Sequence, residues 1–329
     1  MVGAMIGRVI ALAFGLWSVT LPAFAADPVL LHVNTFPTAR SLPFYVGVDR
    51  GFFARRGLAV ELQFTESSER QREGLANGSV DIVHSAVDNA VAMIDVAKVD
   101  IVIVSGGDSG TNEFYVQGDI GDFADIRGKA IVVDATNTAY ALQAKKILAR
   151  HGLRDGADYS LNPAGNGPRR LAALFADKTN AGAILNLPYS LQAAAKGLKS
   201  LGRTTAMLGP YQAGGAFVRR AWARDNAQVL ENYLAAFVEA LRWSLDPQNR
   251  TEAAAILVEK LKLPPDMAEQ SLRLMAEPGF GFARDAAFDM AGFKNVLALR
   301  AEVEGGTPAD AQRYIDLSYY DRARKLLNN

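Results

Sequence analysis

Short β-type runs and helix-type runs alternate through the first two thirds of this 329-residue chain. The mostly apolar runs at 80–84 and 101–105 suit strands that are covered on both faces of a sheet. Helix-type runs separate them. Strands that are separated by helices pair in parallel through right-handed crossovers. The alternation therefore predicts an α/β fold.

The predicted elements form two such cycles, followed by a helical tail. The first cycle has strands at 29–34, 58–64, 80–84 and 101–105 and helices at 41–50, 68–77 and 88–97. The second has strands at 129–134, 159–162, 181–186 and 204–208 and helices at 138–151, 169–177 and 189–196. After Gly214-Gly215 the pattern is almost wholly helical, with a strongly amphipathic segment at 227–245.

Two cycles in a chain of this length predict two lobes. We expect lobe 1 to contain residues 26–110 and 214–329, and lobe 2 to contain residues 111–213. The chain would then cross between the lobes near residues 106–115 and 209–216. The helical tail from about Ala221 should pack back onto lobe 1.

The N-terminus has the pattern of a secretory signal peptide. Arg8 is followed by a largely apolar run at 9–19 and by the small-residue motif Ala23-Phe24-Ala25. This run is shorter than the roughly 20 apolar residues that a membrane-spanning helix needs. We therefore predict cleavage after Ala25 and a periplasmic mature chain of residues 26–329.

The composition narrows the classes of partner. The chain has 35 Lys and Arg against 35 Asp and Glu, and the loss of Arg8 leaves a net charge near −1. Such a balance produces no long-range field for nucleic acid or an anionic membrane. Cysteine is absent, so the chain has neither disulfides nor the thiol that anchors a bacterial lipoprotein. We expect a freely diffusing monomer that binds a small solute.

Motifs for catalysis, metals and cofactors are absent. The three histidines, His32, His84 and His151, have no second ligand at a spacing typical of metal sites. His84 precedes Ser85, but no Gly-x-Ser-x-Gly motif of a hydrolase surrounds that serine. The glycine-rich segment 105–110 lacks the spacing of a nucleotide-binding loop. We predict no enzyme activity, no metal and no cofactor.

Four segments, taken in order, resemble one protein family. They are FYVGVDRGFFARRGLAVEL at 44–62, ANGSVDIVHSAVDNA at 76–90, IRGKAIVVDATNTAYALQAKKIL at 126–148 and AGAILNLPY at 181–189. In this arrangement, from about Val29 to Tyr211, the chain resembles the bacterial solute-binding proteins of the sulfonate, nitrate and thiamine-precursor uptake group.

The resemblance implies a fold and a function. The fold is the two-lobed type II periplasmic-binding-protein fold, in which each lobe is a mostly parallel sheet flanked by helices. The function is that of the extracytoplasmic substrate-binding component of an ABC importer, whose lobes close around a solute and deliver it to a membrane permease. A periplasmic ligand sensor and an enzyme on the same scaffold remain alternatives.

In such a protein the ligand contacts loops at the carboxyl ends of strands in both lobes. Within the first segment, Phe52 and Phe53 should hold helix 41–50 on the core, so that its N-terminus faces this edge. The predicted ligand-binding residues are Arg40, Ser41, Ser85, Asp88, Asn89, Glu113, Asn137, Thr138, Asn166, Asn186 and Tyr189.

Several of these residues have a second interpretation. Ser85 and Asn137 each precede a predicted helix and could be ordinary helix caps. Arg40 could pair with an anion or be a solvated loop charge, and Glu113 could face a cationic group or only the hinge. Asn186 stands where the family often has an acidic or small polar residue. The solute, whether sulfonate, nitrate, pyrimidine or aromatic or organic acid, therefore stays open.

Overall fold

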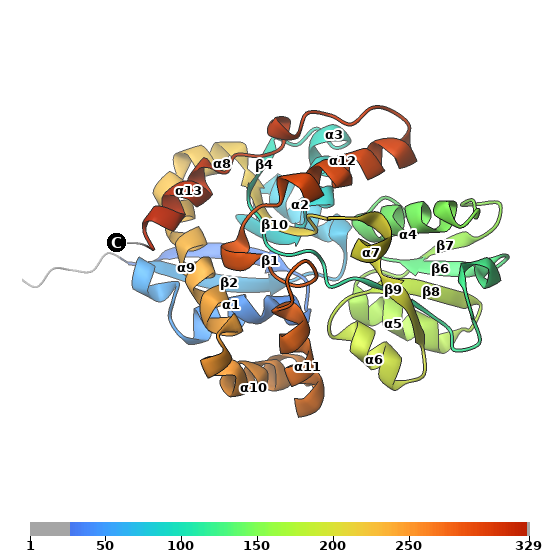
Figure 1. Ribbon diagram of the computed structural model, residues 1–329. Coiled ribbons are helices and arrows are strands. Elements are labelled where there is room, and N and C mark those ends of the chain that lie inside the picture. Colours follow the sequence, from blue (N-terminus) through green and yellow to red (C-terminus); the bar gives the residue numbers. More distant parts are fainter. Residues whose placement is uncertain (1–26, 328–329) are drawn as a thin grey trace, which may run out of the picture.

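The computed structural model describes residues 27–327 (Figure 1). The predicted signal peptide and its cleavage site lie outside these residues. The described chain forms two five-stranded sheets, each flanked by helices, which lie side by side. This confirms the two-lobed α/β fold.

The sheet of lobe 1 has the strand order β2-β1-β3-β10-β4. Its strands are β1 (Val29–Thr35), β2 (Leu58–Phe64), β3 (Ile82–Ala86), β4 (Ile101–Ser105) and β10 (Gly214–Arg219). Strand β1 pairs in parallel with β2 and β3, whereas β10 is inserted antiparallel between β3 and β4. Four strands therefore point in one direction and β10 opposes them.

The sheet of lobe 2 repeats this plan in the order β7-β6-β8-β5-β9. Its strands are β5 (Glu113–Val116), β6 (Ala130–Val133), β7 (Ser160–Pro163), β8 (Asn180–Leu185) and β9 (Lys199–Arg203). Here β5 is the antiparallel insertion, between β8 and β9. In each lobe the opposed strand is the first one that the chain enters after crossing from the other lobe.

Thirteen α-helices surround the sheets in the described part of the chain. They are α1 (Leu42–Asp49), α2 (Ser68–Asn77), α3 (Val87–Asp95), α4 (Ala139–Arg150), α5 (Gly167–Ala176), α6 (Tyr189–Ala195), α7 (Thr204–Leu208), α8 (Arg220–Asp225), α9 (Ala227–Leu245), α10 (Arg250–Leu261), α11 (Pro265–Met275), α12 (Met290–Glu304) and α13 (Ser318–Lys325).

The two inserted strands were missed in the sequence. Strand β10 begins with Gly214 and Gly215, which are poor strand formers and suggested a loop. A Cβ atom on Gly214 would lie 2.2 Å from Asp108 Oδ2, and one on Gly215 would lie 2.7 Å from the Ser105 carbonyl oxygen. Glycine is therefore needed because the two crossing segments pack directly against each other, and this contact is not visible in local sequence.

The prediction of a strand at 204–208 was wrong. These residues form helix α7, and the last strand of lobe 2 is β9, directly before it. The two threonines at 204 and 205 favour a strand locally. Pairing with β5 selects the preceding segment instead, because Arg203 and Lys199 align with Glu113 and Val116.

Helix α1 is held on the core as the Phe-Phe step predicted. The Phe53 ring is buried and stacks on Tyr233 of α9 at a centroid distance of 5.3 Å. A Cβ atom on Gly47 would lie 2.3 Å from the Phe53 ring, so this glycine lets helix and ring approach closely. Phe52 is only half-buried, with the Arg55 guanidinium 4.5 Å from its ring.

The helical tail packs on lobe 1, but one helix also reaches lobe 2. Helix α9 packs on α1, and α13 packs on α9. Helix α12, however, contacts α4 of lobe 2 (Figure 1). Its Asn295 Nδ2 donates to the carbonyl oxygens of Leu208 and Pro210 at 2.9 and 2.8 Å. The tail therefore ties the lobes together rather than covering one of them.

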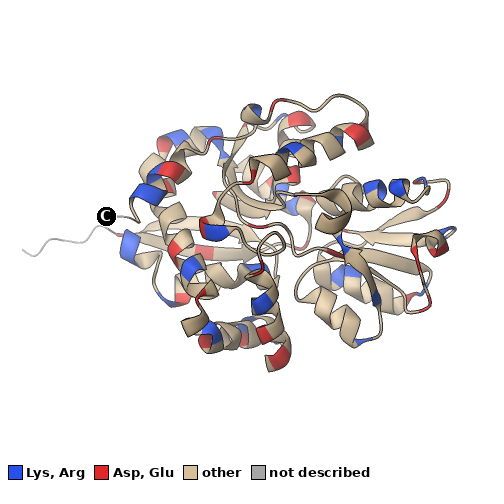
Figure 2. Cartoon of the chain, in the orientation of Figure 1, with Lys and Arg blue, Asp and Glu red and all other residues tan. Residues whose placement is uncertain are grey.

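Charges are mixed over the molecule. Acidic and basic residues are interspersed on the helices of lobe 1, whereas helices α4 and α5 of lobe 2 carry basic residues and no acidic ones (Figure 2). None of the helices in residues 27–327 is long and apolar enough to cross a membrane.

Candidate ligand-binding site between the two lobes

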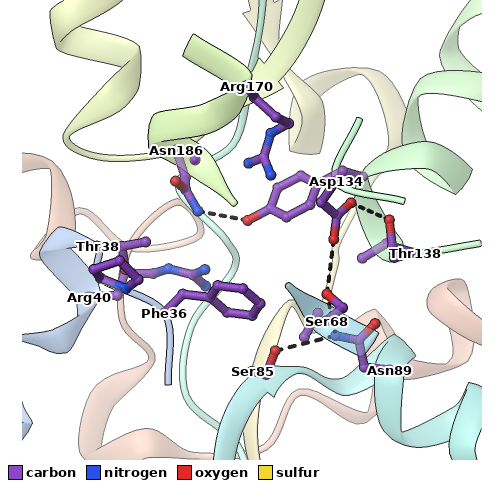
Figure 3. Close-up of a pocket in the computed structure, with 15 residues that line it drawn as sticks. Phe36, Thr38, Arg40, Ser68, Ser85, Asn89, Asp134, Thr138, Arg170 and Asn186 are labelled. Carbon is purple, nitrogen blue, oxygen red and sulfur yellow. Dashed lines mark hydrogen bonds between the residues drawn. The ribbon is translucent and has the colours of Figure 1, made fainter. Parts of the chain in front are cut away.

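A cavity of about 460 Å³ lies between the lobes, and we call it the outer chamber (Figure 3). This volume includes space that is open to solvent. Its walls come from both lobes and are Phe36, Pro37, Thr38, Arg40, Ser68, Ser85, Ala86, Asn89, Asp134, Thr138, Ala139, Tyr140, Gly167, Arg170 and Asn186.

Lobe 1 contributes mainly neutral polar groups. The loop after β1 supplies Phe36, Thr38 and Arg40, the end of β3 supplies Ser85, and α3 supplies Asn89. The carboxyl ends of the parallel strands β1 and β3 lie next to each other, which brings these loops together. This is where α/β sheets bind ligands.

Lobe 2 contributes most of the charge. Asp134 follows β6, Thr138 and Tyr140 lie at the start of α4, Arg170 lies in α5, and Asn186 follows β8. Helix α5 can approach the cavity because it begins with Gly167. A Cβ atom at that position would lie 2.4 Å from the Tyr189 ring.

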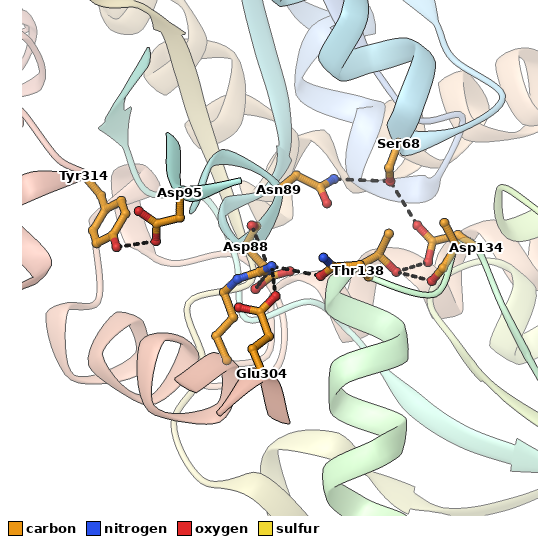
Figure 4. Close-up of polar contacts among 11 residues, drawn as sticks. Ser68, Asp88, Asn89, Asp95, Asp134, Thr138, Glu304 and Tyr314 are labelled. Atoms are coloured by element: carbon orange, nitrogen blue, oxygen red, sulfur yellow. Dashed lines mark hydrogen bonds and ion pairs between the residues drawn. The ribbon is translucent and has the colours of Figure 1, made fainter. Parts of the chain in front are cut away.

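A chain of hydrogen bonds joins the lobes across the cavity floor (Figures 3 and 4). Asn89 Nδ2 donates to Ser68 Oγ at 3.2 Å and to Ser85 Oγ at 3.4 Å. Ser68 Oγ donates to Asp134 Oδ2 at 2.9 Å, and the Thr138 hydroxyl donates to the other oxygen of that carboxylate. Both oxygens of Asp134 therefore already have protein donors.

Further contacts hold the lobes closed around the cavity. The Ala39 amide donates to the Leu187 carbonyl oxygen at 3.1 Å, and the Tyr189 hydroxyl donates to the Pro37 carbonyl oxygen. Arg169 Nη2 forms an ion pair with Glu66 Oε2 at 2.8 Å. The structure is thus a closed form of the two lobes.

Arg170 is a buried charge in the outer chamber, and no carboxylate of the described chain forms an ion pair with it. Its side chain is only 2% exposed, and its guanidinium points toward the space between Asn186 and Asp134 (Figure 3). Nη1 donates to the Gly165 carbonyl oxygen at 3.0 Å, and the guanidinium lies 4.2 Å above the Tyr140 ring. Nε has no hydrogen-bond partner among the described residues.

Arg40 is different, because its charge is neutralised by the protein. Its Nη1 donates to Asp108 Oδ1 at 2.6 Å, and that carboxylate oxygen also accepts from the Gly110 amide at 2.7 Å. Arg40 therefore lines the outer chamber as half of an ion pair.

A second cavity of about 410 Å³ adjoins the first inside lobe 1, and we call it the inner chamber. It shares Phe36, Thr38, Arg40 and Ser85 with the outer chamber. Its further walls are Thr35, Phe44, His84, Gly107, Asp108, Gly214, Gly215, Phe237 and Phe282. Burial lowers the pKa of His84 from its usual 6.5 to about 3, so this imidazole is neutral at physiological pH.

Five of the predicted ligand-binding residues line the outer chamber. They are Arg40, Ser85, Asn89, Thr138 and Asn186. Asn186 Nδ2 donates to the Tyr140 hydroxyl at 2.7 Å, and its Oδ1 has no partner among the described residues. Ser85 is not a helix cap by its side chain, since the residue before α3 is Ala86.

Three of the other predicted residues support the walls from behind. The Ser41 hydroxyl donates to the Phe36 carbonyl oxygen at 2.7 Å, which shapes the loop after β1. Asn166 caps α5 by accepting from the Arg169 amide at 3.4 Å. The Tyr189 ring lies under Gly167, and burial raises the pKa of its hydroxyl. None of these three side chains lines the cavity.

The last three predicted residues lie in other networks. Glu113 begins β5, where its carboxylate accepts from Ser200 Oγ at 2.8 Å. Asp88 and Asn137 both bind Arg300 of α12, at 2.9 and 2.8 Å. Each of these two directly precedes a residue that does line the cavity, Asn89 and Thr138.

Sequence reasoning missed several cavity residues. Phe36 lies in a loop that was expected at the site, but its side chain was not singled out. Ser68 begins α2, a short helix whose start gave no sign of facing lobe 2. Tyr140 and Arg170 lie in the first turns of α4 and α5 and line the cavity. Which side of a helix faces the cavity depends on how the helix is rotated about its axis, and only the tertiary structure shows this.

No group of three or more His, Cys, Asp or Glu side chains in the described part of the chain is arranged to hold a metal ion. The polar groups of the outer chamber are instead hydroxyls, amides and guanidinium groups around one carboxylate.

Comparisons with known proteins agree with this architecture. Similar solved structures include a protein of Bordetella bronchiseptica RB50, with 19% identity, a TM-score of 0.77 and coverage of 92% of this chain and 98% of that chain. The periplasmic nitrate-binding protein NrtA from Synechocystis PCC 6803 has 15% identity and a TM-score of 0.78, with coverage of 92% of this chain and 89% of that chain. The aliphatic sulphonate binding protein SsuA from Escherichia coli has 16% identity, a TM-score of 0.66 and coverage of 89% and 92%.

At these identities the likeness shows a shared fold, that of the periplasmic binding proteins. A comparison with curated protein sequences gives no match. The model of the NMT1-like family matches residues 25–258, which is most of the chain. The family resemblance drawn from the four sequence segments is therefore confirmed, and this protein belongs to the NMT1-like family.

Proposed function

We propose that this protein is the extracytoplasmic solute-binding component of an ABC importer and that it captures a small anion between its lobes. The family and the fold support a binding role. The observation that carries the choice of an anion is Arg170, a buried guanidinium in the outer chamber without a carboxylate partner.

Burial of a cation is costly unless an opposite charge or enough acceptors compensate for the lost hydration. Arg170 has one carbonyl acceptor and the face of one tyrosine ring. The free donors of a guanidinium match the paired oxygens of a carboxylate, sulfonate or nitrate. A bound anion would therefore complete the compensation of Arg170.

The neutral groups in the walls suit the same ligand. Asn186 and Tyr140 from lobe 2 and Ser85 and Asn89 from lobe 1 can orient a polar head group without adding charge. Asp134 is the one carboxylate in the walls, and its two oxygens are oriented by hydrogen bonds from Ser68 and Thr138. Groups from both lobes would contact the solute, so that binding favours the closed form.

Export and delivery follow from the same proposal. The protein would be cleaved after Ala25, act in the periplasm as a monomer, and pass its solute to a membrane permease. N-terminal sequencing of the chain recovered from a periplasmic extract should begin at Ala26 or within a residue or two of it.

The binding proposal is tested by thermal unfolding of the mature chain with nitrate, methanesulfonate, acetate and benzoate. Choline and a neutral sugar serve as controls. An anion at 100 times its dissociation constant should stabilise the fold by about 2.7 kcal/mol. Stabilisation by the cation or the sugar, with no response to any anion, would show that the site is not an anion site.

A further inference from the structure

Five of the thirteen residues that line the inner chamber carry aromatic rings. Phe44 stacks on Phe237 at a centroid distance of 5.0 Å, and the His84 ring lies 4.7 Å from Phe44 and 4.6 Å from Phe237. Phe36 and Phe282 are the other two aromatic residues in the walls. Because these rings already pack on one another, they form a fixed apolar surface.

No uncompensated charge faces the inner chamber. Arg40 and Asp108, the two charged residues in its wall, form an ion pair with each other at 2.6 Å. His84 is neutral, because burial lowers its pKa to about 3. This chamber is therefore unsuited to a charged group, in contrast to the outer chamber with Arg170.

The two chambers adjoin. Phe36, Thr38, Arg40 and Ser85 line the two cavities together. The Phe36 ring extends over Ser85, beside Arg40 (Figure 3). Phe36 thus stands at the boundary between a charged polar space and an aromatic space.

We infer that the solute is an aryl anion, with its oxyanion beside Arg170 in the outer chamber and its aromatic ring in the inner chamber. This inference rests on the proposed anion site and names its substrate class. Aromatic rings favour offset or edge-to-face contact with other rings, which the walls of Phe36, Phe44, Phe237 and Phe282 offer. A small inorganic anion would leave the inner chamber without an occupant.

The test is calorimetric titration of the mature chain with matched anions. Benzoate should bind on the order of 10- to 100-fold more tightly than acetate, since ring burial adds apolar contact. It should also bind about threefold or more tightly than cyclohexanecarboxylate, since the walls are aromatic. Benzenesulfonate and methanesulfonate repeat the comparison with a different head group.

Two variants locate the ring. Thr35→Leu adds bulk to the wall of the inner chamber and should weaken benzoate about tenfold or more while changing acetate by about twofold at most. Phe282→Leu nearly conserves volume and should reduce the preference for benzoate over cyclohexanecarboxylate. Thr251→Leu makes the same change as the first variant on exposed helix α10 and should alter neither affinity. Thermal unfolding checks that each variant is folded.

The outcomes separate the two proposals. If acetate and benzoate bind equally well, or if Thr35→Leu weakens both equally, the ring is not in the inner chamber and only this inference is wrong. If none of the five anions binds, the anion site itself is wrong and the aryl-anion inference is overturned with it. A ring preference that Thr35→Leu and Phe282→Leu remove would support both proposals.

Discussion

The protein compensates the charges of two buried arginines to different extents. Arg170 in the outer chamber and Arg300 in helix α12 are 2% and 3% exposed. Arg300 donates to Asp88 Oδ1 at 2.9 Å, to Glu304 Oε1 at 2.6 Å and to Asn137 Oδ1 at 2.8 Å. Arg170 has one carbonyl acceptor and no carboxylate in the described chain.

The difference distinguishes a buried charge that stabilises the fold from one that remains available to a ligand. Arg300 joins α3 of lobe 1 to the loop before α4 of lobe 2, and its charge is balanced within the protein. Removing one partner from such a pair leaves an uncompensated charge and is strongly destabilising. Arg170 keeps donor capacity that the protein does not use.

The Arg300 cluster and the outer chamber are formed by neighbouring residues at the starts of α3 and α4. Asp88 binds Arg300, and the next residue, Asn89, lines the outer chamber. Asn137 likewise binds Arg300, and Thr138 lines the chamber. The Arg300 cluster therefore holds the two polar corners of the cavity in position from behind. This arrangement would link closure of the lobes to the geometry of the site.

The largest effect is expected for Arg300→Met. It removes the cation and leaves Asp88, whose pKa burial already raises against the effect of Arg300, without its partner. We expect a loss of about 3–5 kcal/mol in the free energy of unfolding, measured by urea denaturation. Lys294→Met on the exposed side of α12 is the control and should change stability by about 0.5 kcal/mol at most. Equal stability of the two variants would remove the distinction between the arginines.

Arg170→Met should have the reverse profile. The affinity for the anion found in the thermal screen should fall about 100-fold, because a charge-assisted hydrogen bond to a buried ligand is lost. Stability without ligand should be unchanged or higher, since a poorly compensated buried charge is removed. Lys178→Met, at an exposed position in the turn after α5, is the control and should change affinity little. Retained affinity in Arg170→Met would refute the anion-binding role of this residue.

His84 is a third case in this comparison, because its buried ring stays neutral and needs no partner to compensate a charge. Its pKa is about 3 in the folded state, against the usual 6.5. Between these values the unfolded chain binds a proton that the folded chain does not, so stability is complete above pH 6.5 and falls as the pH decreases. His84 should account for about 2 kcal/mol of destabilisation between pH 6.5 and pH 5.

Urea denaturation of the wild type and of His84→Phe at both pH values measures this contribution. The variant should lose that part of the pH dependence, whereas His151→Phe at an exposed position should keep it. An identical pH dependence in all three proteins would show that His84 is not held neutral by the fold.

The smallest effect is expected for Asn137→Ala. In the sequence this residue was a candidate for contact with the solute, but its Oδ1 accepts from Arg300 Nη2 and its side chain does not line the outer chamber. Stability should fall by about 1 kcal/mol, and the affinity for the anion should stay within about twofold of the wild type. In the Arg300→Met background the same change should cost less, because the two groups share one hydrogen bond. A large loss of affinity with unchanged stability would return Asn137 to the binding site.

Much of the fold could be predicted from the sequence because its determinants are local. The period-two pattern of β2 and the 3.6-residue pattern of α9 depend only on neighbouring residues, and the segment 227–245 forms one helix as expected. Phe53 and Gly47 meet within a few residues of each other. Strands β5 and β10 were not predicted, because each pairs with strands far away in the chain and begins with residues of weak strand preference.

For the site, the sequence by itself determined which loops would meet, since the carboxyl ends of strands in one sheet gather at one edge. Five of the predicted side chains do line the outer chamber. The tertiary structure decided which neighbour in each loop faces the cavity, Asn89 or Asp88, Thr138 or Asn137. It also decided which arginine has a partner. These choices depend on helix rotation and on α12, which arrives from more than 100 residues away, so no local pattern could contain them.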